Sequence, residues 1–291
     1  MKNSICYSKI IAGTMGWGSW GKGLSTSQMA GLLEHCLHNG ITTFDHADIY
    51  GDYTNEGEFG KALLDSGLKR EGIQLISKCG IQLLGGARRN PLKYYEYSRE
   101  YIIRSAERSL ECLGTDYLDL FLLHRPSPLM DPHEIAEAIL ELQKQGKIRE
   151  FGVSNFTPSQ MALLESVIPI SANQLEFSLT ENAAMYNGSL DAVLVSGAAA
   201  MAWSPLGSYF RTEDTRRERI RKVLLKLTSK YGATEDQLLL SWILRHPAKV
   251  YPVVGTASKE RLTDAGNALK IKMETTDWFA LLAAEQGHEV P

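Results

Sequence analysis

The sequence contains few cysteines, and they form no pattern. Of its 291 residues four are cysteine, with neither a C-x-x-C pair nor the spacing of a disulfide framework. We therefore expect free thiols in a reducing, cytoplasmic environment, at Cys6, Cys36, Cys79 and Cys112. Cys79 follows Lys78 directly, but a buried core thiol is the favoured interpretation over a reactive one.

Long hydrophobic runs and a strong charge of one sign are also absent. No apolar stretch approaches the roughly 20 residues that span a bilayer, and residues 1–8 lack the apolar core of a secretory signal. The formal net charge is -3, from 31 basic and 34 acidic residues. We therefore expect a soluble, cytoplasmic protein with no nucleic-acid or membrane partner.

The sequence lacks a dinucleotide-binding glycine fingerprint and a linker. Residues 13–18 are rich in glycine but do not fit G-x-G-x-x-G, and no helical pattern follows them until Ser25. No stretch rich in Pro, Gly and Ser divides the chain. These absences argue against a doubly wound sheet and favour one domain over residues 1–291.

Short apolar runs that alternate with helical patterns are present through almost the whole length. The runs are rich in Ile, Leu, Val and Phe, as expected for parallel strands buried on both faces. We expect eight strands, at 8–13, 41–45, 74–78, 117–124, 148–154, 171–177, 198–204 and 250–255. Helix start signals stand between them at Ser25, Ser98, Asp131-Pro132 and Thr157-Pro158, and later helices are expected over 214–231, 234–246, 258–269 and 276–285. The alternation predicts a single (β/α)8 TIM barrel.

Four ionisable residues lie at or just beyond the ends of successive strand-like runs: Asp45, Tyr50, Lys78 and His124. Barrel enzymes assemble their active sites at these strand ends. A tyrosine has a reference pKa near 10, which is high for a proton donor at neutral pH. A lysine cation beside Tyr50 favours the phenolate, and an aspartate holds that lysine charged and in place.

This quartet, in this order, resembles the aldo-keto reductase family. The amino-acid sequences of residues 44–51, 123–126 and 151–156 are most similar to those of bacterial members. The resemblance spans about residues 8–270. It implies an NADPH-dependent oxidoreductase that reduces a small-molecule carbonyl substrate, an aldehyde or ketone, to an alcohol. Hydride would pass from the nicotinamide to the carbonyl carbon.

The resemblance also implies a role for each member of the quartet. Tyr50 would donate the proton to the carbonyl oxygen, and Lys78 would lower its pKa. Asp45 would pair with Lys78, and His124 would orient and polarise the carbonyl. Each residue alone has an ordinary explanation, such as a cap, a solvated lysine or a core histidine, so the functional interpretation depends on all four together.

The same resemblance implies a cofactor site on the later strands. A nicotinamide ring needs hydrogen-bonding partners for its carboxamide and a flat aromatic face, which Trp203 offers where many members have tyrosine. After the last strand, hydroxyls and a guanidinium at a helix N-terminus suit the 2′-phosphate of NADPH. The predicted cofactor residues are Gly13, Thr14, Met15, Asp45, Ser154, Asn155, Gln174, Trp203, Ser204, Leu206, Gly207, Gly255, Thr256, Ser258 and Arg261. The family often has Glu-Asn near the adenine, where this sequence has Asp264-Ala265.

The substrate pocket is less well defined by the sequence. Trp17, Trp20 and Tyr53 fall in loops at the expected mouth and are either pocket residues or loop anchors. The stretch 80–97 is a long loop at the same end, either a cover for the site or plain surface.

Two other functions remain open at this point. A barrel hydrolase could bind a metal with His46, Asp48 and His124, although it would leave Tyr50 and Lys78 without a role. A cofactor-sensing protein could bind NADPH but turn over poorly, because the quartet is retained in such members of the family. We favour the reductase, and we expect no metal.

Overall fold

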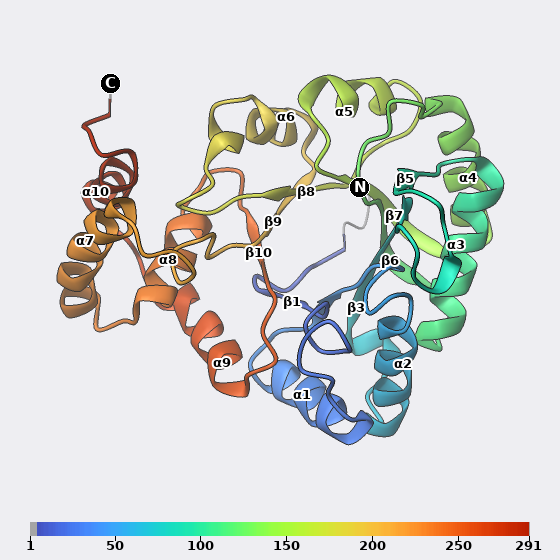
Figure 1. Cartoon of the computed structure of the whole chain (residues 1–291), viewed down its shortest axis with the longest axis horizontal. Coiled ribbons are helices and arrows are strands. Elements are labelled where there is room, and N and C mark those ends of the chain that lie inside the picture. Colours follow the sequence, from blue (N-terminus) through green and yellow to red (C-terminus); the bar gives the residue numbers. More distant parts are fainter. Residues whose placement is uncertain (1–4, 291) are drawn as a thin grey trace.

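Eight parallel strands form a closed barrel in the computed structural model, which describes residues 5–290. Residues 1–4, part of the segment weighed as a secretory signal, lie outside the described residues, as does residue 291. Around the barrel the strands follow chain order (Figure 1): β1 (Ile11–Gly13), β2 (Thr43–Asp45), β3 (Gln74–Cys79), β6 (Leu118–Leu123), β7 (Ile148–Ser154), β8 (Ala172–Glu176), β9 (Ala199–Trp203) and β10 (Tyr251–Val254). The predicted (β/α)8 barrel is confirmed, with all eight strands near their expected positions.

Helices surround the barrel (Figure 1). They are α1 (Thr26–His38), α2 (Asn55–Ser66), α3 (Arg99–Leu113), α4 (Pro132–Lys144), α5 (Pro158–Glu165), α6 (Ser189–Ser196), α7 (Thr215–Tyr231), α8 (Glu235–Leu244), α9 (Lys259–Asn267) and α10 (Thr275–Gln286). Single 3-10 turns occur at Arg70–Gly72, Gly86–Arg88, Ala183–Met185 and Ala268–Lys270. Helices α7 and α10 pack together at one edge of the molecule. No helix within residues 5–290 is both long enough and apolar enough to cross a membrane.

The predicted helix starts coincide with observed N-caps. Ser25 and Thr157 each form a capping box, in which the hydroxyl accepts a backbone N–H and a glutamine side chain returns the bond. Asp131 caps α4 with its carboxylate, and proline follows it at the first helical position. Ser98 precedes α3 without a side-chain cap bond.

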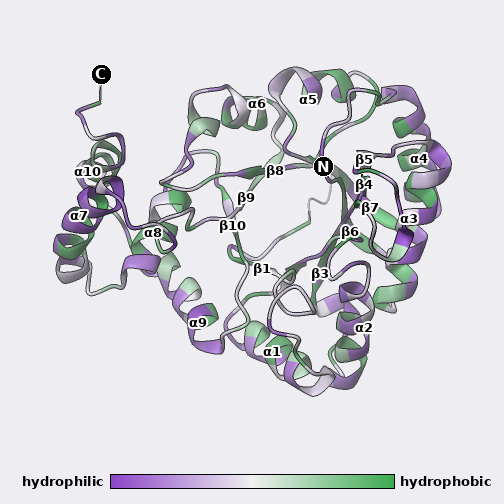
Figure 2. Cartoon of the chain, viewed as in Figure 1, coloured by the Kyte–Doolittle hydropathy of each residue, from purple (hydrophilic) through white to green (hydrophobic). Residues whose placement is uncertain are grey.

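Apolar side chains fill the barrel and the layer between strands and helices. Inside the barrel, Ile11, Ile76, Leu120 and Met201 belong to one buried cluster. Figure 2 shows green and purple alternating around the outer helices, as expected when each helix buries one face. Because the barrel interior is packed, only its end is available for a site.

The stretch 80–97, which we call the flap, contains a small hairpin. β4 (Ile81–Gln82) pairs antiparallel with β5 (Tyr94–Tyr95). The chain leaves β3 through Gly80, whose φ of +116° favours glycine. A Cβ at this position would lie 2.1 Å from the Tyr97 ring, so a side chain would not fit. The flap is therefore an ordered hairpin where the sequence indicated only a long loop.

Candidate active site

A cavity of about 1140 Å³ opens at the carboxyl ends of the barrel strands. Most residues predicted for catalysis and cofactor binding line it. These are Gly13, Met15, Asp45, Tyr50, His124, Ser154, Asn155, Gln174, Trp203, Ser204, Leu206, Gly207, Gly255, Thr256 and Arg261. The barrel fold therefore brings residues from nearly every strand end to a single cavity.

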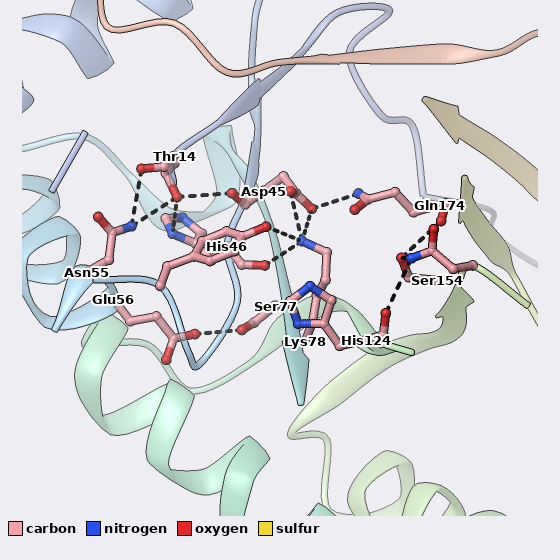
Figure 3. Close-up of polar contacts among 12 residues, drawn as sticks. Thr14, Asp45, His46, Asn55, Glu56, Ser77, Lys78, His124, Ser154 and Gln174 are labelled. Atoms are coloured by element: carbon pink, nitrogen blue, oxygen red, sulfur yellow. Dashed lines mark hydrogen bonds and ion pairs between the residues drawn. The ribbon is translucent and has the colours of Figure 1, made fainter. Parts of the chain in front are cut away.

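Lys78 and Asp45, which lines this cavity, form a buried ion pair (Figure 3). The Lys78 ammonium donates to both carboxylate oxygens of Asp45, at 2.7 and 2.8 Å, and to the carbonyl of His46 at 2.7 Å. Its distance to the Tyr50 hydroxyl is 3.4 Å. Lys78 is completely buried and does not line the cavity, whereas its partners Asp45 and Tyr50 do.

Strand register places these three groups. Asp45 ends β2 opposite Ile76, and Lys78 lies two residues further along β3. Tyr50 is presented by the turn after β2, where its N–H donates to the carbonyl of Ala47 at 3.1 Å.

The turn that carries Tyr50 continues in an unusual conformation. Gly51, Asp52 and Tyr53 have φ values of 61°, 54° and 70°, all in the left-handed region. Two of these are not glycine, a conformation that costs energy and often marks a functional turn. Asn155 and Ser204, which follow β7 and β9 at the cavity, share this feature.

The buried charges shift the pKa values of the quartet. Burial alone would lower the pKa of Lys78, but Asp45 and Tyr50 hold it above its usual value. Burial raises the pKa of Tyr50, and Lys78 offsets this only in part, so the net direction is upward. The sequence predicted the downward pull of the lysine but not the larger effect of burial.

His124 lies across from Tyr50, with the ring centres 6.1 Å apart and the planes nearly perpendicular. Its backbone N–H donates to the carbonyl of Cys79 at 2.9 Å. Burial lowers the pKa of His124 well below its usual value, and Lys78 adds to the effect. Within the described residues Nδ1 has no hydrogen-bond partner. His124 is therefore a neutral imidazole at the cavity.

A chain of hydrogen bonds links the predicted cofactor residues. The Trp203 indole donates to the Asn155 amide oxygen at 2.9 Å, and the Asn155 amide donates to the Ser154 hydroxyl at 2.8 Å. Ser154 donates to the Gln174 carbonyl at 2.9 Å, and the Gln174 amide donates to Asp45 at 2.9 Å (Figure 3). The aromatic face on β9 is thus coupled to the ion pair on β2 and β3, a link that the sequence did not reveal.

A second polar layer supports the quartet from behind (Figure 3). His46 lies 2.8 Å from the Thr14 hydroxyl, which donates to the carbonyl of Asp45 at 3.0 Å. Burial lowers the pKa of His46 to about 3, so it is neutral. The buried Glu56 accepts a hydrogen bond from Ser77 at 2.5 Å. Thr14, predicted to contact the cofactor, belongs to this layer and lies outside the cavity lining.

The far end of the cavity lies against the start of α9. Two of the predicted cofactor residues, Arg261 and Thr256, line it. Ser258 is the N-cap of α9, and its hydroxyl accepts the backbone N–H of Arg261 at 3.3 Å. Ser258 does not line the cavity, so its side chain shapes the helix start. Asp264 lines the cavity and accepts a hydrogen bond from Gln237 at 3.0 Å.

Of the three aromatic residues considered for the substrate pocket, the cavity lining includes Trp20. Trp20 lines the cavity, with its ring centre 6.3 Å from that of Tyr50. Trp17 is a loop anchor, the other alternative considered, because its side chain is fully buried against Phe44 and donates to the carbonyl of Thr256 at 2.9 Å. Tyr53 lines a neighbouring pocket under the flap and stacks on Arg88, outside the main cavity.

Several cavity residues were missed by the sequence argument. They are Ile49, Ile81, Lys93, Arg125, Phe210 and Arg211. The signal for Arg125 was available, because it directly follows His124 at a strand end. The residues of the flap and of the segment after β9 carry no comparable signal.

The residues weighed for a metal site do not form one. Within residues 5–290, no group of three or more His, Cys, Asp or Glu side chains is placed to hold a metal ion. Asp48 faces Tyr101 and Arg88, whereas His46 contacts Thr14. All four cysteines are unpaired, and Cys79 is fully buried, as expected.

The fold and site define a barrel protein with a lysine–aspartate–tyrosine centre at its strand ends. The Aldo/keto reductase family model matches residues 9–285, and the chain belongs to this family of oxidoreductases. A Bacillus subtilis (strain 168) protein described as uncharacterized oxidoreductase YcsN is 42% identical, over 100% of this chain and 98% of its own.

Two further proteins are similar in sequence or structure. The 6-dehydroglucose reductase of Agrobacterium fabrum is 36% identical over 100% of both chains. An aldo/keto reductase from Klebsiella pneumoniae, solved in complex with NADP and acetate, has a TM-score of 0.78 and 27% identity. The match covers 98% of this chain and 93% of that one.

Proposed function

We propose that this protein is an NADPH-dependent reductase of aldehydes and ketones, with Tyr50 as the proton donor. The observation that carries the proposal is the Tyr50 hydroxyl at the cavity, 3.4 Å from the buried Lys78 ammonium. A buried lysine held by a carboxylate and aimed at a phenol is an arrangement for proton transfer.

The cavity residues fit the proposed cofactor. The cavity extends from Tyr50 past the amides of Asn155 and Gln174 to Arg261 at the start of α9. Trp203 offers an aromatic face, and Gly255 leaves open space where a side chain would stand. Arg261 and the α9 N-terminus suit a phosphate. The related Klebsiella pneumoniae structure contains NADP, which supports the same choice here.

Each of the four proposed catalytic side chains has its own role in the reaction. NADPH, when bound, supplies the hydride. Tyr50 gives its proton to the carbonyl oxygen, and its raised pKa keeps the phenol protonated at neutral pH. Lys78 stabilises the phenolate that remains, and neutral His124 orients the carbonyl. Asp45 keeps the lysine charged in its buried site.

The substrate is proposed to be a small carbonyl compound. A relative named for the reduction of 6-dehydroglucose shows that one similar protein acts on an oxidised sugar. We further propose that residues 1–291 act as one catalytic domain in the cytoplasm, with no nucleic-acid or membrane partner.

A carbonyl panel tests the proposed function. Purified protein is mixed with NADPH and with aliphatic, aromatic and sugar aldehydes, ketones and dicarbonyls, and the loss of NADPH absorbance is followed. We expect saturable turnover with several of them. Tight NADPH binding without turnover on any carbonyl would instead support a cofactor sensor.

A further inference from the structure

Two cations lie at the catalytic end of the cavity, and the proposed reaction uses neither of them. Lys93 comes from the flap, and Arg125 follows His124 at the end of β6. Both line the cavity together with Tyr50 and His124. Both also help to lower the pKa of His124, which shows that their charges act on the catalytic centre.

Neither cation has a carboxylate partner. Among residues 5–290, no Asp or Glu oxygen lies within 4.0 Å of the Lys93 ammonium or the Arg125 guanidinium. The charge of Arg125 has a lowering effect on the pKa of Glu176, but the two side chains form no ion pair. By contrast, the Arg211 guanidinium of the same cavity donates to the carbonyl of Gly207 at 2.7 Å. The charges of Lys93 and Arg125 are therefore available to a ligand.

The two cations are held by connected parts of the structure. The Tyr97 hydroxyl, at the end of the flap, donates to the carbonyl of Arg125 at 2.5 Å. The Arg125 guanidinium lies 5.4 Å from the centre of the Trp203 ring, so its side chain rests against the proposed nicotinamide platform. Flap and strand end are thereby fixed together beside the place where a carbonyl would meet Tyr50.

The positive charges of Lys93 and Arg125 are not balanced by the proposed catalytic groups. Lys78 and Asp45 neutralise each other in their ion pair. A wholly apolar substrate would leave Lys93 and Arg125 without an anion, whereas a carboxylate or phosphate oxygen forms charge-assisted hydrogen bonds with both residue types.

We propose that Lys93 and Arg125 bind an anionic group on the substrate, so that the preferred substrates are aldehydes or ketones bearing a carboxylate or phosphate. This inference rests on the proposed function and narrows it to a substrate class. Neutral hydroxyls would gain less from two positive charges.

A matched pair of substrates tests the proposal. The four-carbon acid 4-oxobutanoate and the neutral butanal share an aldehyde and a chain length, and glyceraldehyde supplies a neutral hydroxylated comparison. With saturating NADPH, we expect kcat/KM for 4-oxobutanoate to exceed that of both others by at least about 10-fold. The Lys93→Met and Arg125→Met variants should each reduce this selectivity by about 10–100-fold, mainly through KM.

Arg89 provides the control on the same flap. It is exposed and lines neither the cavity nor the neighbouring pocket, so Arg89→Met should keep both the activity and the selectivity of the wild type. Equal kcat/KM for all three substrates, a preference for glyceraldehyde, or unchanged selectivity in both variants would overturn the proposal while leaving the reductase function intact. No NADPH consumption with any carbonyl would reject the reductase function itself.

Discussion

The most unusual residue of the molecule is a lysine with no access to solvent. Lys78 is completely buried, and its charge is compensated by Asp45 and by the carbonyl of His46. Removing one partner of a buried pair leaves the other charge unpaired, which typically costs about 3–5 kcal/mol. We therefore expect the proposed catalytic centre to be a determinant of stability as well.

A double-mutant cycle measures this coupling. Lys78→Met should lower the free energy of unfolding by about 3–5 kcal/mol, because Asp45 is left buried without its cation. Adding Asp45→Asn should restore part of that loss, which urea unfolding would detect as non-additivity. The exposed pair Lys147–Glu107, at 2.6 Å, is the control, and Lys147→Met should cost less than about 1 kcal/mol. Strict additivity at the buried pair would contradict the account.

Two elements shape the ends of the cavity, the flap and the start of α9. The flap is fastened by Arg88, whose guanidinium donates to Gln82 at 3.0 Å and to Tyr101 at 3.1 Å. The same guanidinium lies 4.1 Å from the centre of the Tyr53 ring. These contacts join the flap to α3 and to the turn that carries Tyr50, so the flap positions Ile81 at the cavity.

Loss of Arg88 should loosen the flap. In Arg88→Ala we expect faster amide hydrogen exchange within residues 81–95 and a higher KM for carbonyl substrates, with NADPH affinity largely kept. Arg89→Ala, one residue further along and exposed, should change neither. If exchange in Arg88→Ala matched that of the wild type, Arg88 would not be the fastening residue.

The start of α9 is predicted to set cofactor choice. Arg261→Ala should weaken NADPH binding by about 1.5–3 kcal/mol, the value of a lost charge-assisted hydrogen bond, and should leave NADH binding nearly unchanged. Lys259→Ala is the control, because Lys259 is exposed and does not line the cavity. Titration by fluorescence compares the two cofactors, and equal weakening of both would place the role of Arg261 elsewhere.

Some of these elements could be predicted from the sequence and others could not. The strand ends were predictable, because each combines a short apolar run with a polar group such as Lys78 or His124. Trp17 was not, since an aromatic residue in a glycine-rich loop has no periodicity to mark it as core. The flap hairpin has only two residues per strand, and Arg88 joins it to Tyr53, which comes from a distant part of the sequence. Long-range contacts of this kind leave no local pattern.

At the scale of the whole molecule, the barrel mouth buries two carboxyl groups that take no part in the proposed reaction. Asp48 and Glu56 are 6 % and 4 % exposed, behind the proposed catalytic quartet. Burial, with a contribution from Glu56, raises the pKa of Asp48 to about 7. In the unfolded chain the same carboxyl has its usual pKa near 4. At this carboxyl the folded protein therefore holds a proton that the unfolded chain loses between about pH 4 and 7.

The contribution of Asp48 to stability should fall as pH rises through that interval. The protonated Asp48 is favoured in the folded state, so its contribution is lost as the carboxyl ionises, by at most about 1.4 kcal/mol per pH unit. Asp48→Asn cannot ionise and should gain stability relative to the wild type from pH 5 to pH 8. Exposed Asp65→Asn is the control. A constant difference between Asp48→Asn and wild type across this range would contradict the raised pKa.

The central claim is that the Tyr50 hydroxyl is the proton donor, and one substitution tests it directly. Tyr50→Phe removes only that hydroxyl, whereas Tyr53→Phe removes one that lies outside the cavity. With NADPH and the best substrate of the panel, we predict that kcat falls by about 10²–10⁴-fold in Tyr50→Phe while NADPH binding stays near wild type. Tyr53→Phe should retain most of its turnover. Retention of most turnover by Tyr50→Phe would contradict the account.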